Sequence, residues 1–329
     1  MMMALRHEPG MARPRGGTGA VTDALVRCVT DLGGEIQTEK AVKQILIDEG
    51  RAVGVRLQTG QEIRAKRGVI SSLDAQRVFL NLIRDRDLDP QFRERVDRRI
   101  VNRNEAILKI DCALTEPPRF IHHNHRDHYL MGSVLIADSV NQVELAHTDP
   151  NIGRIPLENP SMYMVVPTVL DPSMAPNGQH TLWIEFFAPY QIEGREGTGM
   201  KGTGWTEDLK NQVADRVLEK LADYAPNVPS SMIARHVESP PELEDRVGML
   251  RGNYYHLDMT FEQMMCFRPL PEIANYSTPI AGLYLTGAGT HPGGSISGLP
   301  GRNCARVFLQ EQRSLPETLK ETVKSIFGD

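Results

Sequence analysis

Residues 282–309 read GLYLTGAGTHPGGSISGLPGRNCARVFL. A short apolar run is followed by a loop with six glycines and then by a segment with helical spacing. Glycine has no Cβ, and the first N–H groups of a helix lack intrahelical partners. A strand, loop and helix in this order therefore let the backbone approach a bulky planar or anionic ligand closely. We predict a cofactor-binding loop here; the alternative is an ordinary glycine-rich connection.

The loop departs from the strict dinucleotide fingerprint G-x-G-x-x-G. Gly287 and Gly289 supply its first two glycines, but Pro292 stands where the third would allow close packing of the helix on the strand. Beyond it, Ser297 is placed to cap a helix whose first turn includes Pro300.

Composition restricts the class of protein. The 329 residues suffice for one large domain or two, and the net charge is -5 with a pI near 6.1. Basic residues are scattered among acidic ones, so we expect no nucleic-acid partner. No apolar run approaches the roughly 18 residues of a transmembrane helix, and no signal-peptide pattern opens the sequence. A contact with a membrane surface is compatible with this composition.

The cysteines indicate the compartment. They lie far apart without C-x-x-C spacing, so neither a zinc ribbon nor a disulfide scaffold is indicated. We interpret them as core thiols of an intracellular, cytoplasmic protein. They are Cys28, Cys112, Cys266 and Cys304.

The start of the chain lacks a folding pattern. Residues 1–12 are polar and patternless, and we predict that they are disordered. Gly17 and Gly19 then precede a predicted amphipathic helix over residues 20–32. Their spacing begins like the dinucleotide fingerprint, but residues 13–15, RPR, cannot form the required apolar strand. A turn-and-cap role is the better interpretation.

The remaining pattern predicts two sheets and several helices. Alternation over residues 35–65 predicts a β-meander, and the apolar residues 68–70 predict a strand buried on both faces. A second sheet is expected from strands at 106–114, 161–169 and 180–187. Helices are predicted at 75–83, 90–99 and 206–224, with a capping box at Ser314 and Glu317. The core stripe of the helix at 206–224 is Trp205, Leu209, Val213, Val217 and Leu221.

A histidine cluster invites a metal assignment. It comprises His122, His123, His125 and His128. The cluster lacks the i, i+4 framework of a zincin and carries Arg126 in its middle, so we predict a solvated loop and no metal site. No G-x-S-x-G elbow, Walker loop or placed cysteine nucleophile supports acyl or phosphoryl transfer.

What survives is a redox cofactor at the glycine-rich loop. A helix N-terminus aimed at the pyrimidine edge of a flavin would stabilise the negative charge that builds there on reduction. His291 is the candidate to line that pocket. Two interpretations remain open for its side chain: a direct flavin or substrate contact, or a hydrogen bond to the local backbone.

These residues carry a family resemblance. Residues 283–309, together with GGTG at 16–19 and GEI at 34–36, resemble the phytoene-desaturase-like group of FAD-dependent enzymes with the amine-oxidase fold. Within that group, residues 174–190 and 269–301 resemble the desaturase-type β-carotene ketolases of cyanobacteria. The similarity covers nearly the whole chain.

The resemblance implies an α/β fold with an α+β substrate domain. A partial Rossmann-like FAD-binding domain would comprise residues 13–74 and 269–329, and an inserted substrate-binding domain on a mixed sheet would comprise residues 75–268. The implied FAD-contacting residues are Gly287, Gly289, Pro292, Gly293, Gly294 and Gly298, with Gly17 and Gly19 as cofactor-side turn residues. The apolar lining of a substrate channel would be Phe186, Phe187, Tyr190, Met264, Met265 and Phe267, each of which is equally compatible with a core position.

The resemblance also implies an activity and its partners. Members begin with a βαβ unit bearing G-x-G-x-x-G, which this sequence lacks before residue 13. We therefore expect the C-terminal part of a larger enzyme, completed by a missing N-terminal portion or by a separate chain. The expected reaction is FAD-dependent oxidation of a carotenoid taken from a membrane surface, with ketolation of β-carotene as the specific reaction. Desaturation, isomerisation or saturation, or a non-catalytic module without flavin, are the alternatives.

Overall fold

The computed structural model describes residues 12–122 and 127–312. Most of the predicted disordered start, His123, His125, and the Ser314 and Glu317 pair lie outside the described residues. The chain divides into two compact units that alternate along the sequence. The first unit comprises Met1–Thr38 and Asn104–Gly252, and the second comprises Glu39–Arg103 and Asn253–Asp329.

An antiparallel sheet is the centre of the first unit. Its strands, in spatial order, are β6 (Ser133–Ile136), β7 (Met162–Val165), β8 (His180–Pro189), β5 (Glu105–Leu114) and β9 (Met232–Glu238). All described pairs in it are antiparallel, whereas we expected a mixed sheet. The pairing of Ile110 with Ile184 sets the register of β5 and β8. Because side chains alternate along a strand, this register places the apolar side chains of both strands on the same face of the sheet.

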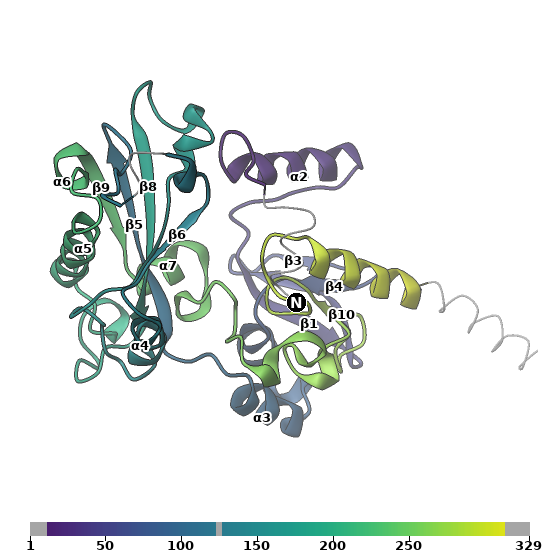
Figure 1. The fold of residues 1–329 in the computed structure, drawn as a ribbon. Helices are drawn as coiled ribbons and strands as arrows, with labels where there is room; N and C mark the ends of the chain where they lie inside the picture. Colours follow the sequence, from purple (N-terminus) through teal and green to yellow (C-terminus); the bar gives the residue numbers. More distant parts are fainter. Residues whose placement is uncertain (1–11, 123–126, 313–329) are drawn as a thin grey trace, which may run out of the picture. The chain divides into compact units, whose positions relative to one another are not determined.

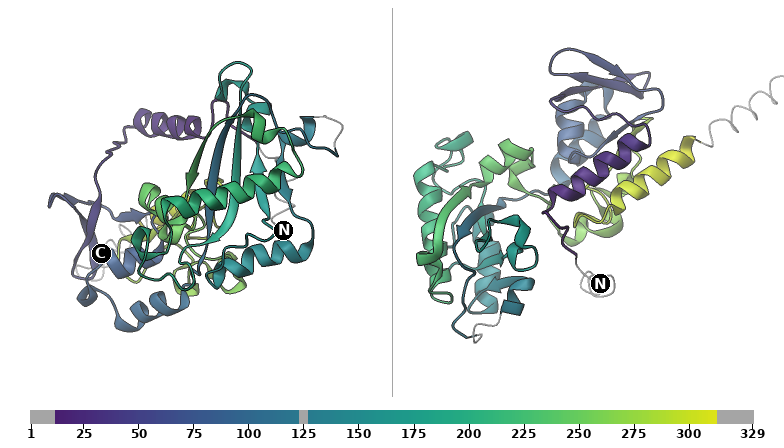
Figure 2. Two further views of the ribbon diagram at one scale, coloured as in Figure 1. Left: turned by 90° about the vertical axis from the view of Figure 1, so that its left-hand side faces the viewer. Right: turned by 90° about the horizontal axis from the view of Figure 1, so that it is seen from above.

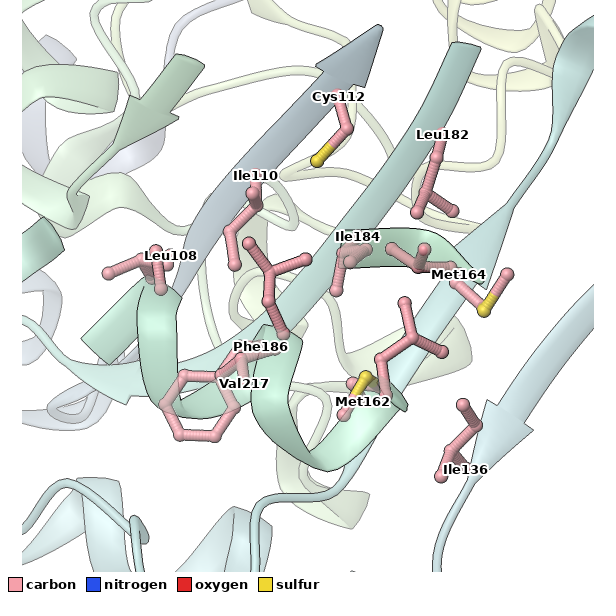
Figure 3. Close-up of a cluster of buried hydrophobic side chains, with 14 of the residues drawn as sticks. Leu108, Ile110, Cys112, Ile136, Met162, Met164, Leu182, Ile184, Phe186 and Val217 are labelled. Atoms are coloured by element: carbon pink, nitrogen blue, oxygen red, sulfur yellow. The ribbon is translucent and has the colours of Figure 1, made fainter. Parts of the chain in front are cut away.

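Helix α5 (Glu207–Ala222) covers that apolar face (Figure 2). Thr206 caps it by accepting a hydrogen bond from the backbone N–H of Leu209 at 3.2 Å. Val217 of α5 lies among side chains of β5, β7 and β8 in a single close-packed core (Figure 3). Trp205 is fully buried and donates from Nε1 to the carbonyl of Pro189 at 2.9 Å. The predicted core stripe is thus confirmed.

The other elements of the first unit are short. Its helices are α2 (Gly19–Asp31), α4 (Val140–Asn151), α6 (Val228–Ser231) and α7 (Pro240–Val247). Its 3-10 turns are Asp127–Met131, Pro167–Val169, Pro172–Met174, Met200–Gly202 and Leu250–Gly252. The predicted helix at 20–32 is present as α2, but none of its residues is buried in the structure.

The second unit contains the predicted meander. Strands β1 (Val42–Asp48), β2 (Arg51–Leu57) and β3 (Glu62–Arg64) pair antiparallel in that order. Glu49 and Gly50, both at positive φ, form the two-residue turn between the first two strands.

A parallel strand pair lies beside this meander (Figure 1). Strands β4 (Val69–Ser71) and β10 (Leu283–Leu285) pair in register, Val69 with Leu283. The core beneath them is completed by the π-helix Arg77–Leu82, by α3 (Pro90–Arg99) and by the 3-10 turn Pro271–Ile273. The 3-10 turns Asp85–Asp87, Phe261–Gln263 and Met265–Phe267 contribute no residue to it. Residues 299–312 form the last described helix, and the Ser297 hydroxyl accepts from the Leu299 N–H at 3.3 Å. Gly298, at φ +68°, separates Ser297 from this helix, so Ser297 bonds the helix start from one residue outside the N-cap position.

The α/β class predicted from the sequence is confirmed. The unit boundaries differ from the predicted domain boundaries, because Phe79 of the π-helix and Phe92 of α3 pack in the core of the second unit. The assignment of FAD binding and substrate binding to separate domains stays a prediction.

Candidate functional site

The glycine-rich loop leaves the parallel strands at their carboxyl ends. The Thr286 N–H donates to the carbonyl of Ser71 at 2.8 Å. This is the last hydrogen bond of the strand pair, and both strands end here. Gly287 follows with φ +86°, and a Cβ on it would lie 2.8 Å from the Ser72 carbonyl oxygen. Ligands of α/β sheets bind in the crevice outside the carboxyl ends of parallel strands. The predicted cofactor loop therefore starts where such a ligand is expected.

Two tight turns and one tyrosine fix the loop. The Thr290 hydroxyl donates to the carbonyl of Gly287 at 3.0 Å, and the Gly293 N–H donates to the carbonyl of Thr290 at 2.7 Å. The Tyr276 hydroxyl donates to the carbonyl of His291 at 2.9 Å and accepts from the Asn303 amide at 2.9 Å. The loop is thus held by hydrogen bonds within it and by Tyr276, which also binds the following helix.

A buried arginine joins the loop to a second segment. Arg268 is 0% exposed, and its guanidinium donates to the carbonyls of Ala288 at 3.0 Å and Gln263 at 3.1 Å. Further donations reach the carbonyls of Tyr255 and Leu257. Burial lowers the pKa of Arg268 to about 10, which still leaves it charged at neutral pH. The cation is compensated by carbonyl dipoles and so ties residues 255–263 to the loop.

At two positions of the loop, the structure of the chain gives no reason for glycine instead of a larger residue. Gly289 and Gly294 do not have positive φ, and a Cβ on either would meet its neighbours at 3.5 and 3.6 Å, ordinary van der Waals distances. Alanine would fit both positions in this structure. A backbone that a flat ligand approaches closely accounts for glycine there. Gly293 and Gly298, in contrast, have φ +105° and +68° and need glycine for conformation.

Unpaired polar atoms gather at the same loop. Among the described residues, five buried side-chain atoms lack a hydrogen-bond partner, and three of them belong to Thr286, His291 and His256. A Cβ on Gly289 would lie 3.5 Å from Nδ1 of His256, so this ring packs against the loop. Buried polar groups without partners are rare, and an unobserved ligand is one of the standard explanations. Glycines without a conformational need, beside unpaired donors and acceptors, fit the polar edge of a flavin.

A buried carboxyl lies in the electrostatic field of His256. Asp74 is 5% exposed and accepts from the Arg77 N–H at 2.8 Å. Burial raises the pKa of Asp74, and the Arg77 hydrogen bond and charge oppose the rise. Burial lowers the pKa of His256, with a smaller opposing effect from Asp74. Both shifts favour the neutral forms of the pair at the loop.

The first unit contains the other predicted cofactor glycines. Gly17 is buried with φ +90°, and a Cβ on it would lie 3.3 Å from Cε of Met174. Gly19 is exposed and begins α2. Both are turn and helix-start residues, as the residue pattern predicted, and their contact with a cofactor stays a prediction.

The predicted channel residues fall into two groups, one in each unit. Phe186 is 0% exposed and packs in the core of the first unit (Figure 3). Phe187 is partly buried, with its ring 4.3 Å from that of His147, and the Tyr190 hydroxyl donates to Glu244 at 2.5 Å. In the second unit, Met264 is partly buried, while Met265 and Phe267 are 38% and 48% exposed. Their role as a channel lining stays a prediction.

Other candidate sites are weaker. Among the described residues, no group of three or more side chains is arranged to hold a metal ion, and His122 and His128 are exposed. A hollow of about 310 Å³ beside α3 is lined by Leu80, Pro90 and charged side chains, and contains none of the predicted site residues.

The cysteine interpretation holds for two residues. Cys112 and Cys304 are buried, and burial raises their thiol pKa values to about 12 and about 11. Cys28 and Cys266 are exposed, so the expectation that all four are core thiols is wrong for these two. No helix in the described part of the chain has the length and apolarity to cross a bilayer.

The sequence missed three residues of this site. Asp74 comes three residues after β4, and a polar side chain just past the end of a strand is a usable signal. The prediction that residues 68–70 form a strand buried on both faces is wrong, because Ile70 of β4 is 46% exposed. His256 and Arg268 lie in irregular segments without periodicity, so no local pattern marks them. Only tertiary packing brings them to the loop.

Comparison with known proteins agrees with this geometry. The family model of the flavin containing amine oxidoreductases matches residues 2–301. The pyridine nucleotide-disulfide oxidoreductase domain-containing protein 2 of Mus musculus is 32% identical over 92% of this chain and 51% of its own length. The lycopene-forming phytoene desaturase of Pseudescherichia vulneris is 26% identical over 91% of this chain and 56% of its own length. The chain thus spans about half the length of the curated relatives it matches.

One solved structure supports the fold. The crystal structure of an oxidoreductase from Methanosarcina mazei matches with a TM-score of 0.53 and 21% identity, over 91% of this chain and 55% of that one. The relatedness to phytoene desaturases predicted from the sequence is confirmed, whereas a particular closeness to ketolases stays a prediction. On the family match over nearly all of its length, the chain belongs to the flavin containing amine oxidoreductases, a family of FAD-dependent enzymes.

Proposed function

We propose that this chain provides the flavin-ring end of the FAD site in an oxidoreductase that oxidises a carotenoid or a similarly long, apolar polyene. The observation that carries the cofactor part is the loop after β10. In that loop, neither the backbone conformation nor the packing of the chain requires glycine at positions 289 and 294. Three buried polar atoms without hydrogen-bond partners lie beside them.

The residues have separable roles in this proposal. Gly289, Gly293 and Gly294 let the backbone lie against the ring, and the side chains of Thr286 and His291 hydrogen-bond its polar edge. The N-terminus of helix 299–312 stabilises negative charge there through the helix dipole. A bound flavin supplies the two-electron oxidant. Arg268 and Tyr276 act on the loop and keep it in one conformation.

A matched pair of alanine variants tests the cofactor part. Gly294→Ala adds a methyl group that the chain tolerates, since this methyl would lie 3.6 Å from Ala288 Cβ, an ordinary van der Waals distance. We expect an unchanged unfolding midpoint and at least a tenfold loss of flavin affinity, about 1.4 kcal/mol. Gly132→Ala is the control, because Gly132 lies in the first unit, lacks positive φ and has nothing nearer than 4.0 Å. Equal flavin affinity of the two variants would contradict the proposal.

The substrate part rests on the relatives and on exposed apolar side chains. A phytoene desaturase is among the matched proteins, which favours a polyene. In the second unit, Phe261 is 90% exposed and Phe267 is 48% exposed, in neighbouring 3-10 turns. Clustered exposed aromatic side chains are typical of surfaces that meet an apolar partner. We propose that this segment meets the membrane in which the substrate dissolves, and vesicle co-sedimentation that survives Phe261→Ser would contradict that role.

Introduction of a keto group into β-carotene is the specific reaction that we propose, following the ketolase-like segments of the sequence. Desaturation is the second candidate, favoured by the phytoene desaturase relative. Expression in β-carotene-producing and in phytoene-producing cells separates the two, with pigments identified by chromatography and mass spectrometry. Ketocarotenoids support the first reaction and new conjugated double bonds in phytoene the second. Unchanged pigments in both hosts would refute both.

We further propose that a segment outside the described residues holds the AMP end of FAD, either in the same polypeptide or in a separate chain. The parallel sheet of β4 and β10 has two strands in the described structure, whereas parallel sheets are normally larger and covered on both faces. The cell experiment therefore includes co-expression with the FAD-binding N-terminal part of a relative. If that addition leaves flavin content unchanged, the proposed division of the site is wrong.

A further inference from the structure

His256 has a backbone conformation that is uncommon for residues other than glycine. Its φ is +68°, in the left-handed region, and its N–H closes a turn onto the carbonyl of Asn253 at 3.0 Å. A residue with a Cβ is strained there, and such strain persists only where the surroundings impose it. Glycine or asparagine would satisfy the turn better. The imidazole therefore calls for an explanation beyond local folding.

The surroundings of His256 hold the ring at the cofactor loop. Arg268 holds this turn, because its Nη2 donates to the carbonyls of Tyr255 and Leu257, the residues on either side of the histidine. The same guanidinium donates from Nε to the carbonyl of Ala288 in the loop. A Cβ on Gly289 would lie 3.5 Å from both Cβ and Nδ1 of His256. One buried cation thus fixes the ring against the loop.

One ring nitrogen of His256 lacks a hydrogen-bond partner. Nδ1 of His256 is buried and has no partner in the described structure. Burial lowers the pKa of the ring, the charges of Arg268 and Arg77 lower it further, and the carboxylate of Asp74 opposes them. A neutral imidazole offers one donor and one acceptor. The atom is therefore available to a neutral heteroaromatic ligand that lies on the loop.

We infer that His256 is a further cofactor-binding residue, whose Nδ1 hydrogen-bonds the flavin ring at the Gly289 side of the loop. This inference rests on the proposed function. It accounts for the three observations together: the left-handed backbone, the arginine clamp on both neighbouring carbonyls and the buried atom without a partner. It also places a cofactor contact outside the glycine-rich stretch, on a segment that the fold brings to it.

The test uses the full chain with FMN as the probe, so that only the ring end of the site is examined. His256→Gly removes the imidazole and relieves the backbone strain. We expect the dissociation constant for FMN to rise about three- to tenfold, the effect of one hydrogen bond, while the melting temperature stays equal or rises. His256→Asn tolerates positive φ and keeps a hydrogen-bonding side chain, so its affinity should lie closer to that of the unaltered chain.

A strain-matched control separates cofactor binding from stability. Glu39 is an exposed residue at φ +57°, so Glu39→Gly gives similar relief without touching the loop. We expect FMN affinity like that of the unaltered chain. Equal FMN affinity in His256→Gly and Glu39→Gly would overturn the inference, as would a fall in melting temperature of both His256 variants without a change in affinity. Failure of the unaltered chain to bind FMN would overturn the proposed function and this inference with it.

Discussion

Gly287 provides the sharpest test of how the cofactor loop is built. Its φ of +86° lies in the left-handed region, where a side chain costs about 1 kcal/mol. A Cβ would also lie 2.8 Å from the Ser72 carbonyl oxygen and 3.4 Å from Ser72 Cβ, at the end of β4. Overpacking of this kind costs a further amount of about 1–3 kcal/mol. Gly287→Ala should therefore lower the free energy of unfolding by about 2–4 kcal/mol.

Gly298→Ala is the matched control for that substitution. Gly298 has φ +68°, and nothing lies within 4 Å of the position of its Cβ. The variant should lose only the conformational part, about 1 kcal/mol. Urea unfolding followed by far-UV circular dichroism measures both variants, and their difference isolates the contact with the strand. Equal losses in the two variants would refute the close approach of the loop to β4.

Three further changes test the fold around the site. Glu185 lies partly buried on β8, where burial raises the pKa of its carboxyl from 4.5 to about 7 and the charge of Lys109 opposes the rise. The contribution of this carboxyl to the free energy of unfolding is complete below pH 4.5 and is lost as the pH rises through about 7. Glu185→Gln should therefore match the unaltered chain at pH 4 and exceed its stability by up to about 3 kcal/mol at pH 8, and a pH-independent difference in melting temperature would contradict this. Asp89→Ala removes the side chain that caps α3 through the Phe92 N–H at 2.8 Å and should cost about 1 kcal/mol in urea unfolding; no loss would show that the cap is idle. Trp205→Ala should cost about 3–5 kcal/mol by leaving a cavity in the first unit, and a loss below about 1 kcal/mol would show that the core refills.

Periodicity predicted most of the fold because the elements concerned obey local rules. The stripe from Trp205 to Leu221 repeats every four residues and is buried against the sheet, as a helix of period 3.6 requires. The turn at Glu49 and Gly50 likewise follows from local chemistry. Helix α2 shows the limit of this reasoning. Its apolar face was evident in the sequence, but Leu25 is 62% exposed, since burial depends on what packs against a helix.

The candidate site was predictable only in part, for a physical reason. The loop glycines are recognisable in the sequence, because they are close together and their role depends on the local backbone and on the ligand beside it. Asp74, His256 and Arg268 come to the loop from distant positions in the chain, and each has a role that depends on burial and on partners. Arg268 in particular resembles any surface arginine in the sequence, yet it is 0% exposed and bonded to carbonyls.

Flavin binding by the purified, unaltered chain tests the central claim most directly. We expect saturable, one-to-one quenching of flavin fluorescence, with FMN competing against FAD and AMP failing to compete. Those results follow because the described residues offer a loop for the ring and contain no G-x-G-x-x-G fingerprint behind an apolar strand for the pyrophosphate. A folded chain that leaves flavin fluorescence unchanged, or that binds AMP in competition with FAD, would contradict the claim that this chain binds the flavin-ring end of FAD.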